Sequence, residues 1–216
     1  MKLMMFEKAG GAALGLVEGA SVIDLGAADA SLPKDLAALI AAGPAALDKA
    51  KAAAAKAPAS AKFALASVKA ALPIARPPKF ICVGLNYALH AKEGGHPIPT
   101  YPSFFLRVPT SLTAPGAPVL RPKNSIQLDY ECELTIVIGK GGRYIPEAKA
   151  LDHVFGYTLF NDVSVRDFQR KTTQWMPGKN FDSTGPLGPW VVTADELPPG
   201  ASGLRITTRV NGETMQ

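Results

Sequence analysis

The sequence predicts an α+β protein in which β-strands predominate. Two observations support this prediction. Short apolar runs recur along most of the 216 residues, and Pro or Gly interrupts the chain at nearly every junction between them. Helical patterns are few. The composition, 47% hydrophobic and 19% charged, is typical of a globular protein with one sizeable core, or with a core and a small domain.

The first 72 residues are expected to form a small α/β domain. It begins with predicted strands, separated by Gly-containing turns, at residues 1–7, 12–17 and 21–25. Ser31 is a suitable N-cap for a helix that continues to Ile40, and Gly43-Pro44 ends this helix. The Ala-rich run at 45–57 favours a second helix, which Pro58 terminates.

A Pro-rich connector at 73–78 separates this domain from the rest of the chain. It reads Pro-Ile-Ala-Arg-Pro-Pro, a composition typical of a stiff linker. A second domain is expected at 79–216, with one helix at about 163–174. Its apolar runs predict strands at 80–84, 104–107, 130–138, 155–160, 187–192 and 204–210. This part of the chain is therefore expected to have a mainly β core.

Composition and charge argue against several classes of function. The net charge is +5, but no Lys/Arg run is interleaved with aromatic residues, so we expect no nucleic-acid partner. No apolar run approaches the ~20 residues of a membrane span. The start of the chain is too short for the apolar region of a signal peptide. Cys82 and Cys132 lie in apolar runs without a Cys-X-X-Cys spacing, which suits a reducing compartment and predicts a cytoplasmic location.

A stack of acidic residues is the most informative functional signal. Side chains alternate between two faces of a strand, so Asp129, Glu131 and Glu133 share one face, while the apolar even-numbered positions 130–138 should face a core. Like charges this close raise one another's pKa, and a bound cation would neutralise them. Oxygen-only ligands favour Mg²⁺, Mn²⁺ or Ca²⁺. The alternative is a solvated strand face that is acidic without binding a metal.

A further acid, Asp162, ends a predicted strand just before the helix at 163–174. Arg166 lies one turn beyond Asp162 and Gln169 one turn beyond Arg166, so both would project towards whatever Asp162 faces. Asp162 could instead cap the helix, and Arg166 could simply form a salt bridge with it. Lys179 lies in a loop rich in Gly, Pro and aromatic residues. Its charge would compensate nearby carboxylates and attract a substrate anion.

A histidine–glutamate pair is the candidate for acid–base chemistry. His90 and Glu93 are three residues apart, so one helical turn would place them side by side. A carboxylate beside an imidazole orients it and raises its basicity, as a general base requires. Gly94-Gly95 follows and would let the segment move as a lid. The alternative is an exposed loop histidine without a catalytic role.

Five blocks of the sequence resemble the fumarylacetoacetate hydrolase (FAH) family, in the order in which the family carries them. The blocks are Val83-Gly84-Leu85-Asn86-Tyr87 with His90 and Glu93, then 129–134, 156–169, Gly178-Lys179-Asn180-Phe181-Asp182, and 185–190. The resemblance covers about residues 79–216. Residues 1–72 are similar to the variable small domain of many bacterial members.

The resemblance implies an FAH-type mixed β-sandwich roll that forms a homodimer, with a small N-terminal α/β domain. The family continues past residues 210–213 with more core strands. The C-terminal part of the core is therefore expected to be missing from this chain, which would leave sheet edges and apolar surface exposed.

The resemblance also implies roles for individual residues. The expected metal ligands, for Mg²⁺ or Mn²⁺ and with Ca²⁺ as a further candidate in crystals, are Glu131, Glu133 and Asp162. The expected catalytic residues are His90 and Glu93, as a water-activating dyad on a lid, and Lys179. The expected substrate-binding residues are Asn86, Tyr87, Arg166, Gln169 and Arg107, the last standing where many members have lysine.

The implied function is metal-dependent hydrolysis of a C–C bond in an acylpyruvate- or fumarylacetoacetate-like 1,3-dicarbonyl acid. The reaction would pass through an enolate that the metal and Lys179 stabilise. The same chemistry supports decarboxylation of oxaloacetate, or isomerisation of a diacid of the 2-hydroxyhepta-2,4-diene-1,7-dioate type. An alternative of a different class is a catalytically silent metal-binding or interaction protein.

Overall fold

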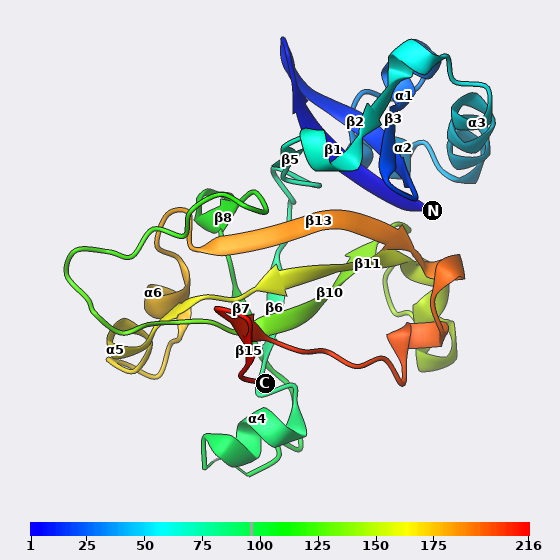
Figure 1. Cartoon of the computed structure of the whole chain (residues 1–216). Coiled ribbons are helices and arrows are strands. Elements are labelled where there is room, and N and C mark those ends of the chain that lie inside the picture. The colour runs from blue at the N-terminus through cyan, green and yellow to red at the C-terminus, as the bar shows by residue number, and fades with distance from the viewer. Residues whose placement is uncertain (96) are drawn as a thin grey trace.

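The computed structural model describes residues 1–95 and 97–216. Over these residues, strands outweigh helices in an α+β architecture, which confirms the predicted fold class. The main sheet contains β1 (Lys2–Lys8), β2 (Gly11–Glu18), β3 (Ser21–Asp24), β4 (Lys62–Ala64), β5 (Ala70–Ala71), β8 (Leu112–Thr113), β10 (Cys132–Ile138), β11 (Val154–Asn161) and β13 (Gly185–Thr193). Its order is β10-β11-β13-β1-β2-β3-β4, with β5 beside β1 and β8 parallel to β13 (Figure 1).

Further strand pairs stand apart from this sheet. They are β6 (Ile81–Gly84) with β7 (Ser103–Leu106), β9 (Leu128–Asp129) with β12 (Ser164–Val165), and β14 (Arg209–Val210) with β15 (Glu213–Thr214). The helices are α1 (Leu25–Ala28), α2 (Leu36–Ala41), α3 (Pro44–Ala55), α4 (Ala88–Glu93), α5 (Arg166–Gln169) and α6 (Met176–Lys179). Among the helices that the described residues form, none combines the length and the apolar character needed to cross a membrane.

The N-terminal strands bury apolar side chains on both faces of β1. Leu3 and Met5 join the cluster that packs under α1, α2 and α3, whereas Met4 and Phe6 point to the other face, towards Phe63. This alternation follows from the two-residue period of a strand. The helix predicted to begin after Ser31 is α2, which starts later than predicted because its N-cap is Asp35 and not Ser31. The Asp35 side chain accepts a hydrogen bond from the backbone of Ala38 at 2.8 Å.

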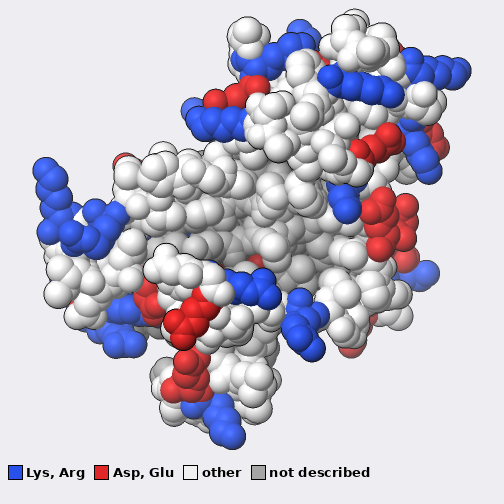
Figure 2. Space-filling view, in the orientation of Figure 1, with Lys and Arg blue, Asp and Glu red and all other residues white. Residues whose placement is uncertain are grey.

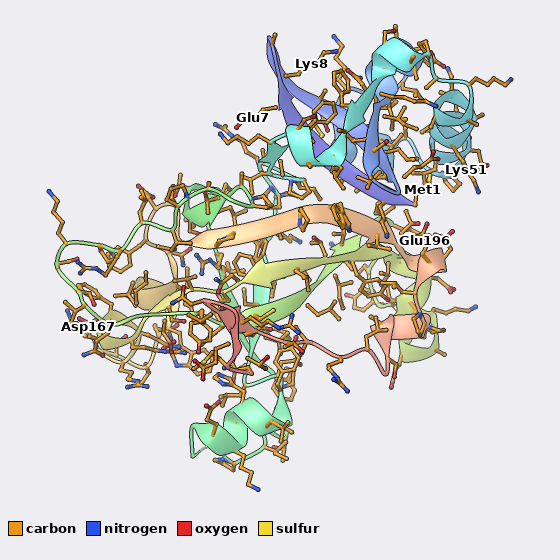
Figure 3. All side chains as sticks on the ribbon, in the orientation of Figure 1. Met1, Glu7, Lys8, Lys51, Asp167 and Glu196 are labelled. Carbon is orange, nitrogen blue, oxygen red and sulfur yellow. The ribbon has the colours of Figure 1, made fainter. Side chains whose placement is uncertain are left out.

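The N-terminal strands and the core strands belong to one sheet. β1 pairs with β13 through Lys2 opposite Val192 and Leu3 opposite Val191. The ammonium group of Met1 also lies 2.6 Å from a carboxylate oxygen of Glu196, and Figure 3 shows the two side by side where the N-terminal part meets the core. The main sheet therefore continues across the boundary expected at 73–78, and the connector itself is not a strand of that sheet.

The helix predicted at 163–174 is wrong for most of its length. Ser164 and Val165 instead form β12, which pairs with β9, and α5 covers only one turn from Arg166 to Gln169. The β-branched Val163 and Val165 are buried, at 3% and 0% exposure, and favour extended backbone there. Asp162 is consequently not the helix N-cap, a position that Val165 takes.

The predicted burial of the apolar face of strand 130–138 is also wrong. Leu134, Ile136 and Ile138 on β10 are 37%, 51% and 60% exposed. The predicted strand at 204–210 shortens to Arg209–Val210. The side of the sheet that carries these β10 side chains therefore has little cover in the part of the chain that the structure describes.

Candidate functional site

The acidic residues converge where β10 begins and β11 ends. The antiparallel register sets Cys132 opposite Asn161, so Glu131 and Asp162 follow as neighbours at the open end of the pair. The backbone N–H of Asp162 donates to the carbonyl of Glu131 at 2.8 Å. The N–H of Glu131 in turn donates to the side chain of Asn161 at 3.0 Å. The sheet thus brings together acids that are about thirty positions apart in sequence.

Lys179 bridges two of these acids. Its ammonium group lies 2.6 Å from Oε2 of Glu131 and 2.7 Å from Oδ2 of Asp162. Lys179 is 2% exposed and Asp162 3% exposed, so this contact is shielded from solvent. Burial alone would raise the pKa of Glu131, but Lys179 and Arg166 together hold that pKa below its usual value. The carboxylate of Glu131 is thus stabilised in its charged form.

Arg166 binds the outer side of the same cluster. Its Nη1 lies 2.6 Å from Oε1 of Glu131, and its Nη2 lies 2.7 Å from Oδ2 of Asp129. Gln169, one turn further along α5, accepts a hydrogen bond from Nη1 at 2.9 Å. The carboxylates bound by Arg166 are therefore those of Glu131 and Asp129 rather than that of Asp162. Arg166 and Gln169 do project towards the acidic cluster, as the one-turn spacing suggests.

Glu133 has no cationic partner among the described residues. Its pKa is raised to about 8, first by burial and then by the charges of Glu131 and Asp162. The hydroxyl of Tyr87 lies nearby, where it accepts a hydrogen bond from the backbone N–H of Leu134 at 3.0 Å. Glu133 is thus the carboxylate of this cluster whose charge is least compensated.

The donor set of this cluster fits a hard divalent cation in its chemistry. It offers carboxylate oxygens from Glu131, Glu133 and Asp162, and oxygen is the ligand that Mg²⁺ and Mn²⁺ prefer. Within residues 1–95 and 97–216, no three His, Cys, Asp or Glu side chains converge on one point. The ammonium group of Lys179 lies between Glu131 and Asp162 instead. Glu133 supports the fit, because it has no ion-pair partner among the described residues and a bound cation would favour its charged form.

The His90–Glu93 pair lies on α4, the short helix that projects from the core in Figure 1. His90 Nδ1 is 3.7 Å from Glu93, too far for a hydrogen bond, and it is buried without a hydrogen-bond partner. His90 Nε2 is 3.9 Å from Oε1 of Glu131. The helix therefore places the imidazole between the expected dyad partner and the acidic cluster.

Two of the cavities that adjoin the acidic cluster are lined by His90. One, of about 460 Å³, is lined by Asn86, Tyr87, His90, Glu93, Glu133 and the C-terminal segment around 206–208 and 215–216. The other, of about 390 Å³, is lined by residues that include His90, Glu131, Arg166, Gln169, Arg170 and Lys179. Every expected catalytic or substrate-binding residue except Arg107 therefore lines one of these cavities. Arg170 is a cavity residue that sequence reasoning missed, because an exposed arginine at a helix end carries no distinctive pattern.

Arg107 lies behind the cluster rather than in a cavity. Its side chain is fully buried, and its Nη1 is 2.7 Å from Oδ1 of Asp162. No cavity reaches it among those that adjoin the acidic residues. The substrate contact expected of Arg107 therefore has no support in the geometry, since all its surroundings are protein.

Comparison with known proteins identifies the family of this chain. The family model described as fumarylacetoacetate (FAA) hydrolase C-terminal matches residues 79–216. The chain is 40% identical, over 205 residues, to oxaloacetate tautomerase fahd2, mitochondrial, from Xenopus laevis, covering 94% of this chain and 63% of that protein. The chain thus spans less than two thirds of the length of this relative.

Solved structures agree with this match. Fumarylacetoacetate hydrolase from Exiguobacterium antarcticum superposes with a TM-score of 0.80 at 35% identity, covering all of this chain and 74% of that one. Maleylpyruvate hydrolase from Sphingobium sp. SYK-6, in complex with manganese(II) and pyruvate, gives 0.72 at 29% identity, with coverages of 90% and 68%. The chain therefore belongs to the fumarylacetoacetate hydrolase family.

Proposed function

We propose that this chain carries the active site of a divalent-metal-dependent enzyme that acts on a 2-oxo acid through an enolate. The observation that carries the proposal is the buried arrangement of Glu131 and Asp162 on Lys179, beside an uncompensated Glu133. Such a concentration of perturbed charges at a cavity is typical of a functional site. The membership of an enzyme family supports the same conclusion.

Glu131, Glu133 and Asp162 are the residues that would hold Mg²⁺ or Mn²⁺. When bound, the ion would supply Lewis-acid stabilisation of the negative charge that develops on the oxygens of the 2-oxo acid. The neighbouring structure that contains manganese(II) and pyruvate supports both the class of ion and the class of ligand.

The cationic side chains of the 390 Å³ cavity favour an acid with more than one anionic group. Lys179 and Arg166 already contact carboxylates of the protein. Arg170 lines the same cavity, is exposed, and forms no ion pair with any described residue. An additional carboxylate of a substrate would find its counter-charge there. We therefore propose a 2-oxo dicarboxylic acid as the substrate class.

For C–C hydrolysis, His90 would act as the general base. A proton on Nδ1, the nitrogen nearer to Glu93, would leave Nε2 free to accept a proton from water. The hydroxide oxygen would then bond to the distal carbonyl carbon, and the C–C bond would break. Its electron pair would pass to the 2-oxo acid fragment as an enolate, next to the ammonium group of Lys179. Protonation at carbon completes the products, a carboxylic acid and a 2-oxo acid.

Tautomerisation of a 2-oxo diacid is the second candidate. The name of the Xenopus laevis relative, an oxaloacetate tautomerase, supports it. This reaction needs no water, because a proton only moves between the enol oxygen and the neighbouring carbon. The same enolate would also be formed in decarboxylation of oxaloacetate or in isomerisation of an unsaturated diacid. All four reactions share the charged cluster and differ in whether His90 must activate water.

A substrate panel with the Mn²⁺-loaded chain separates these reactions. Hydrolysis releases pyruvate from an acylpyruvate, tautomerisation changes the enol absorbance of oxaloacetate, and decarboxylation releases CO₂. We expect His90→Ala to abolish hydrolysis while Mn²⁺ still binds. His153→Ala, a histidine outside both cavities, serves as the matched control. Mn²⁺ binding without turnover of any 2-oxo acid would instead identify a catalytically silent metal-binding protein.

We also propose that the chain acts as a homodimer in the cytoplasm. The exposed apolar side chains of β6 and β7 support the first point. The two free cysteines, Cys82 and Cys132, are compatible with the second. Light scattering tests the dimer, and localisation of the tagged full-length protein tests the compartment.

A further inference from the structure

Arg107 is held by its protein surroundings in a way that a merely structural ion pair does not require. Its side chain has no exposed surface. Nη1 donates to Oδ1 of Asp162 at 2.7 Å and to the backbone carbonyl of Val163 at 3.1 Å. One nitrogen of the guanidinium group thus contacts both the side chain of Asp162 and the backbone that follows it.

The other nitrogens of Arg107 meet two buried hydroxyl groups. Nε donates to Ser111 Oγ at 3.2 Å, and Nη2 donates to Thr184 Oγ1 at 2.9 Å. Ser111 and Thr184 are 0% and 1% exposed. Each hydroxyl donates its own proton to a backbone carbonyl. Ser111 donates to Val108, and Thr184 donates to Phe181. Both oxygens therefore present only lone pairs to the arginine.

Phe160 and Gly185 border the guanidinium group closely. The ring of Phe160 lies 5.1 Å from the guanidinium carbon, within the range of a cation–π contact. A Cβ added at Gly185 would come within 2.9 Å of Nη2 and 2.8 Å of the Phe160 ring. We call this site, formed by Ser111, Phe160, Thr184 and Gly185, the guanidinium cradle. A lysine ammonium could keep the charge but could not reach all these partners at once.

The two oxygens of Asp162 consequently have different surroundings. Oδ1 is committed to Arg107, whereas Oδ2 faces Lys179 and the carboxylate of Glu131. We propose that Arg107 is a positioning residue that fixes the carboxylate of Asp162 so that Oδ2 points into the metal site. This inference rests on the proposed function, in which Asp162 is a metal ligand. Partners that orient a ligand in this way typically change metal affinity 10- to 100-fold when they are altered.

Arg107→Lys tests the proposal directly. It keeps the positive charge beside Asp162 but removes the planar fork that reaches Ser111 and Thr184. We expect its affinity for Mn²⁺ alone, measured on the full chain from the EPR signal of free Mn²⁺, to fall about 10- to 100-fold. We expect kcat to fall at subsaturating Mn²⁺ with little change in KM for the oxo acid, because Arg107 does not touch substrate. Arg143→Lys, the same change at an exposed position, should leave Mn²⁺ affinity unchanged.

Two further measurements keep the outcome clear. Thr184→Val removes one hydrogen bond of the cradle without touching Asp162, and we expect it to weaken Mn²⁺ binding several-fold even if Arg107→Lys does not fold. Unfolding of Arg107→Lys, Asp162→Asn and the double variant should show that the two substitutions are not additive.

Wild-type Mn²⁺ affinity in folded Arg107→Lys, or in Thr184→Val, overturns the proposal, and so does strict additivity in unfolding. A wild-type chain that binds no Mn²⁺ overturns the proposed metal site itself. In that case the unfolding of the two single variants and the double variant alone tests whether Arg107 orients Asp162.

Discussion

One ammonium group, that of Lys179, contacts two buried carboxylates. Its partners Glu131 and Asp162 lie at 2.6 and 2.7 Å, and nearly all of the lysine is shielded from solvent. A buried charge without a partner is far more costly than an exposed one, because water no longer solvates it. Lys179 therefore contributes to folding as well as to the site.

Replacing Lys179 by methionine keeps the length of the side chain and removes the charge. We expect Lys179→Met to destabilise the protein by about 3–5 kcal/mol, because the buried carboxylates of Glu131 and Asp162 lose the ammonium group between them and keep only Arg166 and Arg107 as cationic partners. Urea unfolding followed by circular dichroism measures this change. Lys140→Met, at an exposed position, is the matched control and should change stability by less than about 0.5 kcal/mol. Equal stabilities of the two variants would show that the buried ion pairs do not stabilise the fold.

The sequence predicts the acidic cluster better than its partners. Alternation along one strand places Glu131 and Glu133 on the same face, because the side-chain period is fixed by backbone geometry. The bridging position of Lys179 depends on α6, a short helix nearly fifty residues away in sequence, and no local pattern encodes that distance. The hydrogen bond from Arg107 to Thr184 likewise joins residues far apart in sequence, whereas its other hydroxyl partner, Ser111, lies only four residues away at the end of a 3-10 helix.

At the scale of elements, the close packing of α5 and α6 carries the site. Gly178 in α6 lies against Gln169 in α5, where an added Cβ would fall 2.4 Å from the backbone nitrogen of Gln169. Lys179 follows Gly178 directly, and Arg166 starts α5. The absence of a side chain at Gly178 therefore sets how closely Lys179 and Arg166 approach the same carboxylate.

Gly178→Ala should push the two helices apart. We expect a loss of about 1–3 kcal/mol in the free energy of unfolding, as is usual when a well-packed contact is overfilled. We also expect a rise in the KM for the oxo acid, since Lys179 and Arg166 would be displaced together. Gly141→Ala is the control, because nothing lies within 4 Å of the position of its added Cβ. Thermal unfolding and steady-state kinetics on both variants give the answer, and unchanged values for Gly178→Ala would rule out this role of the helix contact.

The elements also show where sequence patterns stop being informative. The sequence predicts the strands at 1–7, 80–84, 155–160 and 187–192 nearly at their observed positions, because each is a short, mainly apolar run. The region after Asp162 was predicted as a helix, although pairing of Ser164 and Val165 with β9 holds it extended. Such a pairing between distant segments overrides local helix preference.

At the scale of the whole molecule, charge and apolar surface are distributed differently. Figure 2 shows Lys and Arg scattered over the visible face without a continuous basic stripe, in line with the absence of a nucleic-acid motif in the sequence. Exposed apolar side chains occur on several elements, including β10, and those of β6 and β7 stand opposite one another as cross-strand pairs. Ile81 pairs with Leu106 and Val83 with Phe104, and these side chains are 54%, 47%, 40% and 61% exposed. Adjacent cross-strand pairs of this kind form a patch rather than isolated apolar residues.

We expect this β6–β7 patch to be covered by a second copy of the chain. Multi-angle light scattering should then give twice the 22.6 kDa of the monomer. Leu106→Lys places a charge in the patch and should shift the equilibrium towards monomer, because a lysine buried in an apolar interface loses its hydration. Leu120→Lys makes the same change at a leucine of similar exposure, 55%, that lies outside β6 and β7, and it should leave the dimer intact.

A wild-type chain that is monomeric at all accessible concentrations, or a Leu106→Lys variant that dimerises as well as the control, would show that another surface or no surface mediates self-association. The comparison of Leu106→Lys with Leu120→Lys therefore tests whether the β6–β7 patch forms the interface of the predicted homodimer.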